Sequence, residues 1–212
     1  MGVILNPRGA GGSGKTELTR RIMAIYGWRR GAERSQRIGP IYRERRKLPI
    51  GYRLVHPHGQ RALVVIGHYE RTCGGCDTIG RADGGIDEVF RLVDTYSLSG
   101  DDVLFEGLAV SRELKRSAVL ASLHDLHVLR LDTAVDQCIR NLIMRRRARR
   151  SLRPSIARAA VAECKAIAEA CDALRLRANV RHVDFDEAFS QARDLLGLSI
   201  LCATGPSRQS PR

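Results

Sequence analysis

The sequence predicts an α/β fold, in which a mostly parallel β-sheet is covered by helices on both faces. Apolar, β-branched runs such as residues 3–5 and 126–131 alternate along the chain with longer segments of helical spacing, and this alternation is typical of βαβ units. A glycine-rich loop separates the first strand from the first helix. The 212 residues are enough for one α/β domain with a substantial core.

The N-terminal half contains three apolar runs that are expected to form strands and two amphipathic segments that are expected to form helices. Residues 17–26 have apolar side chains at helical spacing and no Pro or Gly, which favours a helix. Residues 49–55 and 62–66 flank a turn that contains Pro and Gly, so a hairpin or a pair of adjacent strands is expected. Residues 67–79 would then form a loop at a strand's carboxyl end, before an amphipathic helix at 86–98.

The C-terminal half continues the alternation of strands and helices. Asp132 and Thr133 are typical helix caps and Pro154 suits a first helical turn, so long helices are expected directly after both positions. The tail at 203–212 has no apolar anchor and is expected to be disordered. The expected strands are 102–107, 126–131 and 180–183, and the expected helices are 111–123, 132–150, 155–176 and 186–196.

Residues 9–16 read Gly-Ala-Gly-Gly-Ser-Gly-Lys-Thr and fit G-x-x-x-x-G-K-[ST], the phosphate-binding loop of nucleoside-triphosphate enzymes. The expected strand before it and helix after it are the context that this motif requires. Glycines allow the backbone N–H groups to point inward around an anion, and the helix N-terminus adds its positive dipole end. In this interpretation Lys15 reaches the β- and γ-phosphates of ATP or GTP, and the Thr16 hydroxyl binds Mg²⁺. The whole loop, Gly9, Ala10, Gly11, Gly12, Ser13, Gly14, Lys15 and Thr16, would bind the nucleotide.

Charge is distributed unevenly along the chain. The formal net charge is +13, with +10 in residues 1–60, −5 in residues 61–139 and +8 in residues 140–212. The stretch 28–47 is rich in Arg and partly loop. Basic flanks of this kind attract polyanions such as nucleic acid, although a general Arg bias of the genome would give the same composition.

Glu106 ends the apolar strand at 102–107. A carboxylate in this position of a phosphate-loop protein is placed to help hold Mg²⁺ or its water shell. The alternative is a carboxylate that caps the next helix.

Six arginines between residues 140 and 150 resemble the lid of P-loop kinases, where arginines stabilise charge on the transferring group. Arg140 would contact the nucleotide, and Arg145 and Arg146 the reacting phosphates. On one continuous helix, Arg145 would share a face with Arg149, and Arg146 with Arg150. A solvated basic face, or contacts of the last arginines with a DNA backbone, are alternatives.

Asp77 lies in the segment Cys-Gly-Gly-Cys-Asp-Thr at residues 73–78. In kinases that phosphorylate a hydroxyl, a carboxylate beyond the second strand orients the acceptor and accepts its proton. The Cys73–Cys76 spacing also admits a zinc or redox interpretation, but no second pair is spaced to complete a zinc site. A GTPase is disfavoured because no Asn-Lys-x-Asp motif is present, and a motor or helicase because the chain is short.

Several of these segments together resemble one family, the phage P-loop kinases of thymidine hypermodification, which are 5-hydroxymethyluracil DNA kinases. The matching segments are the phosphate loop after Asn6-Pro7, Gly-His-Tyr at 67–69, Gly-Gly-Cys-Asp-Thr-Ile at 74–79, Phe-Glu-Gly at 105–107, and the pattern from Leu131 to Arg145. The resemblance covers residues 3–150. It implies transfer of the γ-phosphate of ATP to a 5-hydroxymethyl pyrimidine in DNA.

The resemblance also implies a role for each matching residue: Lys15 and Thr16 on phosphate and Mg²⁺, Glu106 near the metal, Asp77 as the base, and Arg145 or Arg146 in the lid. The expected organisation is a P-loop kinase domain at residues 1–200 with its Arg-rich lid helix at about 138–153. Two other hypotheses remain open, a nucleotide or small-molecule kinase and a DNA-binding NTPase without a phosphoacceptor.

The composition also sets expectations about location. Six cysteines at irregular spacing indicate free thiols in a reducing compartment. No run approaches the length of a membrane helix, and no signal peptide is recognisable. A cytoplasmic protein without a membrane partner is expected, in the host cytoplasm if a phage encodes it.

Overall fold

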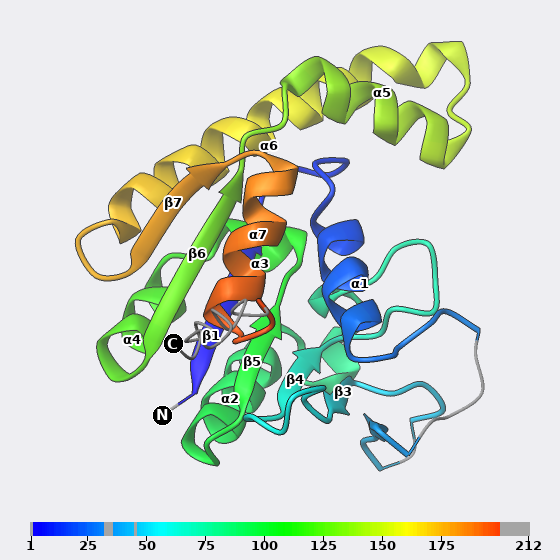
Figure 1. Cartoon of the computed structure of the whole chain (residues 1–212). Coiled ribbons are helices and arrows are strands. Elements are labelled where there is room, and N and C mark those ends of the chain that lie inside the picture. Colours follow the sequence, from blue (N-terminus) through cyan, green and yellow to red (C-terminus); the bar gives the residue numbers. More distant parts are fainter. Residues whose placement is uncertain (1, 32–35, 45, 200–212) are drawn as a thin grey trace, which may run out of the picture.

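A computed structural model describes residues 2–31, 36–44 and 46–199 of the chain (Figure 1). The tail predicted to be disordered at 203–212 and Cys202 lie outside these residues. Strands and helices alternate as the sequence predicts, and the α/β class is confirmed.

The described residues form one seven-stranded sheet with the order β2-β3-β4-β5-β1-β6-β7. From β4 to β7 all neighbouring strands pair in parallel, whereas β3 pairs antiparallel with both β2 and β4. The predicted hairpin is therefore β3 with β4. The strands are β1 (Val3–Arg8), β2 (Ile38–Ile41), β3 (Gly51–Leu54), β4 (Leu63–Ile66), β5 (Asp102–Phe105), β6 (Asp125–Leu131) and β7 (Asn179–Val183).

Helices cover both faces of the sheet, as predicted (Figure 1). Ile4 and Leu5 are neighbours on β1, and because side chains alternate along a strand they enter different cores. Ile4 packs with residues of α2, α4 and α6, while Leu5 packs with residues of α1 and α7. The helices are α1 (Lys15–Ile25), α2 (Gly85–Leu98), α3 (Leu108–Arg112), α4 (Lys115–Leu123), α5 (Val135–Arg146), α6 (Arg153–Leu174) and α7 (Phe185–Leu195), with short 3₁₀ turns at Cys76–Thr78, Arg81–Asp83 and Arg150–Leu152.

The α5–α6 pair forms a helical hairpin that extends beyond the sheet (Figure 1). Leu142 of α5 packs against Ile156 and Ala160 of α6 in a small apolar cluster of its own. The hairpin is joined to the body of the protein through α6, whose Ile167 and Cys171 belong to one of the two main cores. Its outer part therefore depends on few apolar contacts, which is the property of an element that can move.

The long helix predicted at 132–150 is wrong at both ends. The helix begins after Ala134, which makes no side-chain cap bond, and the Thr133 hydroxyl instead donates to the Ser13 carbonyl at 3.0 Å. At the other end Arg147 adopts a left-handed conformation, with φ 46°, so the pairing of Arg145 with Arg149, and of Arg146 with Arg150, on one helical face is also wrong.

One further prediction differs from the structure. The expected helix at 111–123 is two helices, α3 and α4. The basic stretch at 28–47 was expected to be partly loop, and the structure adds the edge strand β2 within it. Edge strands tolerate Pro40 because one side of the strand needs no ladder hydrogen bonds, and this is why the sequence signal for β2 is weak.

Arg8 at the end of β1 is completely buried. Its Nε donates to Asn6 Oδ1 at 2.6 Å, one Nη donates to Ser117 Oγ at 2.6 Å, and the other donates to the Ser111 carbonyl at 3.4 Å. Burial lowers the pKa of the guanidinium below its ordinary value. These bonds join β1 to α3 and α4 directly beneath the loop that begins at Gly9. Within the described residues, no helix is long and apolar enough to span a membrane.

We expect Arg8→Ala to destabilise the protein by roughly 3 kcal/mol, because it removes three hydrogen bonds and leaves buried polar partners unpaired. The measurement is the free energy of unfolding from urea denaturation. Arg91→Ala is the control, since Arg91 forms a surface ion pair with Glu88 and exposed pairs contribute at most about 1 kcal/mol. Equal losses in the two variants would contradict a structural role for Arg8.

Candidate active site

The glycine-rich loop lies between β1 and α1, at the carboxyl ends of the parallel strands, where ligands bind in open α/β sheets. Gly12 and Gly14 have φ angles of 85° and 99°, a region that favours glycine. A Cβ on Gly12 would also come within 2.6 Å of the Cys138 carbonyl. Glycine is therefore required at position 12 both by the conformation of the loop and by its close approach to α5.

Lys15 is the first residue of α1, and only 7% of it is exposed. Its Nζ donates to the carbonyls of Gly9 at 2.6 Å and Ala10 at 3.1 Å, inside the loop. Burial lowers the pKa of the amine, while Glu106 and Asp77 act in the opposite direction. A buried amine held only by carbonyl dipoles is ready to exchange those contacts for a stronger, charged partner.

Thr16 and Glu106 form the floor of the site. The Thr16 hydroxyl donates to Glu106 Oε1 at 3.0 Å, and Glu106 is 1% exposed. Burial raises the pKa of Glu106 to about 7, although Lys15 and the Thr16 hydrogen bond lower it. Gly75 packs closely against this carboxylate, since a Cβ at Gly75 would lie 2.5 Å from Glu106 Oε1.

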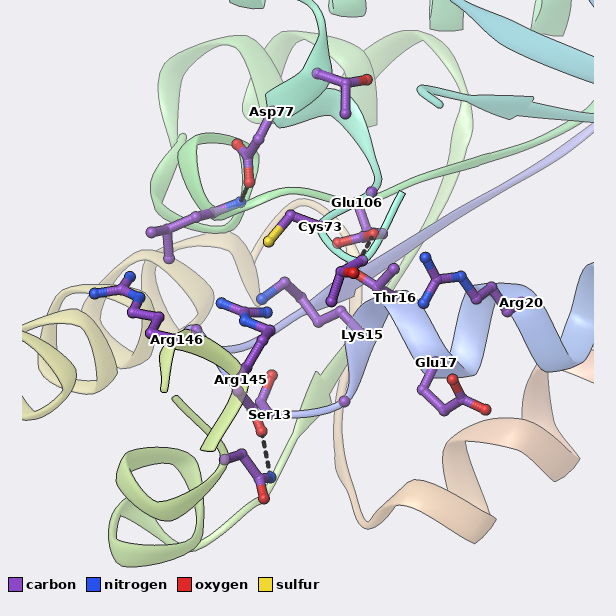
Figure 2. Close-up of a pocket in the computed structure, with 18 of the residues that line it drawn as sticks. Ser13, Lys15, Thr16, Glu17, Arg20, Cys73, Asp77, Glu106, Arg145 and Arg146 are labelled. Carbon is purple, nitrogen blue, oxygen red and sulfur yellow. Dashed lines mark hydrogen bonds between the residues drawn. The ribbon is translucent and has the colours of Figure 1, made fainter. Parts of the chain in front are cut away.

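A cavity of about 500 Å³ lies above this floor (Figure 2). Segments distant in the sequence line it: the glycine-rich loop, the 72–78 segment, the end of β5, and helices α5 and α6. Of the predicted site residues, it brings together Gly11, Gly12, Ser13, Gly14, Lys15, Thr16, Asp77, Glu106, Arg145 and Arg146. Gly9 and Ala10 lie in the same loop and accept hydrogen bonds from Lys15 through their carbonyls.

Asp77 lines the cavity from the opposite side to α1 (Figure 2). Its two carboxylate oxygens accept hydrogen bonds from the backbone N–H groups of Leu108 at 2.7 Å and Ala109 at 3.3 Å. The carboxylate is thus fixed at the start of α3 while it stays exposed to the cavity. The capping of this helix, considered as the alternative for Glu106, is performed by Asp77.

The arginines of the predicted lid separate into two groups. Arg145 and Arg146 of α5 line the cavity. The Arg145 side chain points to the region of the Lys15 amine, whereas that of Arg146 points away from it (Figure 2). Arg140 is not among the lining residues and donates instead to the Gln137 side chain at 2.8 Å. Its contact with the nucleotide stays a prediction, although Arg140 does not line the cavity.

The sequence analysis assigned no role to several of the lining residues, among them Glu163, Asn141 and Arg20. Glu163 of α6 accepts a hydrogen bond from the Gly11 N–H at 3.0 Å. Asn141 of α5 donates to the Gly12 carbonyl at 2.8 Å. Arg20 of α1 donates to the Tyr69 carbonyl at 2.9 Å and to that of Arg71. No local motif surrounds Glu163, so only the packing of the α5–α6 hairpin over the loop reveals it.

The two cysteines of the 73–76 segment have different environments. Cys73 is exposed and lines the cavity, whereas Cys76 is buried and its pKa is raised well above the ordinary value by burial. Both are free, as are Cys138, Cys164 and Cys171. In the described part of the chain, no group of three or more His, Cys, Asp or Glu side chains could hold a metal ion by itself.

Comparison with known proteins identifies a relative of this chain. No protein-family model matches the chain. A 5-hmdU DNA kinase of Pseudomonas phage PaMx11 is 36% identical over 154 residues, which make up 72% of this chain and 74% of that protein. The chain belongs to the 5-hmdU DNA kinase family. It is therefore an enzyme, a kinase, and the family resemblance noted in the sequence is confirmed.

The raised pKa of Glu106 predicts how the stability of this member of the 5-hmdU DNA kinase family depends on pH when no metal is bound. A carboxyl group with a pKa of about 7 in the folded state and an ordinary value of about 4.3 when unfolded stabilises the fold when it is protonated. This contribution is present below pH 4 and is lost as the pH rises toward 7. Glutamine does not titrate, so Glu106→Gln should not lose this stability as the pH rises. The free energy of unfolding of the variant minus that of wild type should therefore increase by roughly 3 kcal/mol between pH 4 and 8.

The measurement is urea unfolding of both proteins across this pH range in EDTA. A constant difference between Glu106→Gln and wild type would show that folding does not raise the pKa of Glu106.

Proposed function

We propose that the protein is an ATP-dependent P-loop kinase that transfers the γ-phosphate of ATP to the 5-hydroxymethyl group of 5-hydroxymethyluracil in DNA. The similarity to a phage 5-hmdU DNA kinase is the observation that carries this proposal. The charge distribution supports a polymeric acceptor, because both flanks of the chain are strongly basic. Such an enzyme would act on phage DNA in the host cytoplasm.

The donor half of the reaction belongs to the glycine-rich loop and α1. The phosphates of ATP would lie on the backbone N–H groups of residues 9–16, at the positive end of α1. Lys15 would leave the carbonyls of Gly9 and Ala10 and bind the β- and γ-phosphates. The Gly11 N–H would likewise be released from the Glu163 side chain.

The floor of the cavity fits Mg²⁺. Thr16 Oγ1 and Glu106 Oε1 lie 3.0 Å apart, and Mg²⁺ prefers such oxygen ligands together with water and substrate phosphates. Thr16 would hold the ion directly, and Glu106 would hold it or its water shell. When bound, Mg²⁺ neutralises charge on the β- and γ-phosphates.

The lid would complete the donor site within a P-loop kinase domain at residues 1–200. Arg145 and Arg146 at the end of α5 line the cavity, so they would contact the γ-phosphate as it transfers. Guanidinium groups placed where negative charge develops stabilise the transition state more than the ground state. The arginines beyond the helix, Arg147, Arg149 and Arg150, are exposed and would contact the DNA backbone.

The acceptor half belongs to Asp77. The hydroxymethyl oxygen attacks the γ-phosphorus, the bond between that phosphorus and the β–γ bridging oxygen breaks, and ADP leaves. Asp77 accepts the proton that the hydroxyl loses. The two backbone hydrogen bonds from Leu108 and Ala109 hold its carboxylate in place for this task. A target base in a duplex would be flipped out to reach the cavity.

The test of the proposed function is a transfer assay with labelled ATP. Three acceptors are compared: DNA that contains 5-hydroxymethyluracil, the same DNA with thymine, and the free modified nucleoside. Label should enter only the modified DNA, and Lys15→Ala should reduce its rate by at least about 100-fold, as expected for loss of a charge-stabilising group.

Other outcomes of this assay have defined meanings. Label on the free nucleoside alone would indicate a nucleotide or small-molecule kinase. ATP hydrolysis without transfer would indicate a DNA-binding NTPase. No label on modified DNA would overturn the proposal.

Asp77→Asn separates the base from the helix cap. An asparagine oxygen still accepts a hydrogen bond from the N-terminus of α3, so the fold and ATP binding should be retained. Transfer should fall by roughly 10²–10⁴-fold, the usual contribution of a general base. ATP binding measured by calorimetry and transfer measured with modified DNA give the two readouts. Transfer near the wild-type rate would show that Asp77 only caps α3.

A further inference from the structure

A second cavity of about 250 Å³ shares no lining residue with the first. Its walls carry the rings of Trp28, Tyr42, Tyr52 and His68, and we call it the aromatic cavity. Trp28 follows α1, Tyr42 follows β2, Tyr52 is in β3, and His68 follows β4. Trp28, Tyr42 and Lys47 belong to the basic stretch at 28–47, for which the sequence analysis found no motif.

The aromatic wall is held rigidly. Trp28, Tyr52 and His68 are each at most 5% exposed. The Trp28 and Tyr52 rings pack edge to face, with centroids 6.1 Å apart at 69°. The Tyr52 hydroxyl lies 3.1 Å from the ring nitrogen Nδ1 of His68. The backbone N–H of His68 donates to Thr78 Oγ1 at 3.0 Å. Burial lowers the pKa of His68, so a neutral imidazole faces the cavity at neutral pH.

Two cations stand at the same cavity. Arg29 and Lys47 line it, and both are exposed. Within the described residues neither forms an ion pair or a side-chain hydrogen bond. The one acid that lines the cavity, Glu70, already accepts a hydrogen bond from the Gly31 N–H at 2.8 Å. Flat rings beside two unpaired cations match a nucleotide, whose base stacks and whose phosphate is anionic.

The aromatic cavity is adjacent in the chain to the proposed acceptor site. The segment at residues 67–79 lines both cavities: His68 and Glu70 face the aromatic cavity, while Cys73, Gly74 and Asp77 face the first. The segment folds back on itself through a bridge between His68 and Gly75. A strand of nucleic acid that crosses this segment would contact both cavities.

We propose that the aromatic cavity binds a nucleobase of the DNA strand that neighbours the hydroxymethylated base, with Arg29 and Lys47 on the adjoining phosphates. The proposal rests on the proposed function, since the strand is the DNA on which the kinase acts. The base bound here is not the acceptor, because Lys15, Thr16, Glu106 and Asp77 all lie at the other cavity. The aromatic cavity would instead fix the position of the strand.

Trp28 is the only tryptophan of the chain, so its fluorescence reports on this cavity directly. The full-length protein is titrated, without ATP, with a single-stranded oligonucleotide that carries one central 5-hydroxymethyluracil. A series of the same oligonucleotide has an abasic residue at each of the flanking positions in turn. Binding is followed in parallel by anisotropy of a dye on the DNA. Trp28→Phe keeps the ring and removes the signal, which identifies the source of the fluorescence.

The intact strand should quench the fluorescence of Trp28, and one abasic position should abolish the quenching while the others retain it. Quenching that no abasic position affects would overturn the proposal. So would binding by anisotropy without any quenching, or equal quenching by ATP alone. Phosphate transfer is assayed separately. Loss of transfer with position-specific quenching would refute the proposed kinase function and leave the nucleobase site, whereas transfer without quenching would refute the site.

Substitutions in the exposed part of the cavity complete the test. Tyr42, 45% exposed, can be truncated without opening a core, and Tyr42→Ala should weaken DNA binding about fivefold, at the low end for loss of a base–aromatic stack. Leu176→Ala is its control, because Leu176 is 94% exposed and lies before β7, at the opposite end of the sheet. Equal affinities for the two variants would overturn the proposal.

The cations are tested by salt dependence. Arg29→Ala and Lys47→Ala should each lower the slope of log affinity against log salt concentration by about 0.7, the value for one phosphate contact on a single strand. Arg177→Ala, at the opposite end of the sheet, is the matched control and should leave the slope unchanged. A slope unaffected by Arg29→Ala and Lys47→Ala would exclude phosphate contacts at the aromatic cavity.

Discussion

The hydrogen bond between Thr16 and Glu106 is the contact on which the rest of the site depends. It joins the first turn of α1 to the end of β5, and so places the glycine-rich loop over a buried carboxylate. Burial alone would favour the protonated form of Glu106, whereas Lys15 and Thr16 favour its charge. The site therefore holds a carboxylate near its point of ionisation, where a bound cation can decide its charge.

The glycine-rich loop also has its polar groups engaged before any ligand binds. Its backbone groups are already engaged, the Gly11 N–H with Glu163 and the carbonyls of Gly9 and Ala10 with Lys15. Anionic phosphate would replace the first contact and attract the amine away from the others. Glu163 belongs to the same α5–α6 hairpin as the arginines at the end of α5, so phosphate that displaces Glu163 would break a contact between the loop and the hairpin.

The errors of the sequence analysis have identifiable physical causes. The helix predicted at 132–150 ends at Arg146 because the chain must turn back so that α6 can pack on α5, and no local residue announces that turn. Arg140 does not line the cavity because it lies five residues before Arg145, which places the two side chains on different faces of α5. The edge strand β2 carries Pro40 and little apolar periodicity, so its pairing with β3 is decided by the sheet.

The sequence by itself determined the alternation of strands and helices, the glycine-rich loop with Lys15 and Thr16, and the acid at the end of β5, because each is encoded in a few adjacent residues. The tertiary structure decided what meets them. Asp77 was expected from its local segment, but its hydrogen bonds to the start of α3 come from packing. Glu163 and the aromatic cavity are brought to the site by segments far apart in the chain, and Glu163 lies 152 residues from the Gly11 N–H that it binds. Side chains brought together only by packing leave no local pattern, whereas a loop that must curl around phosphate requires its glycines in order.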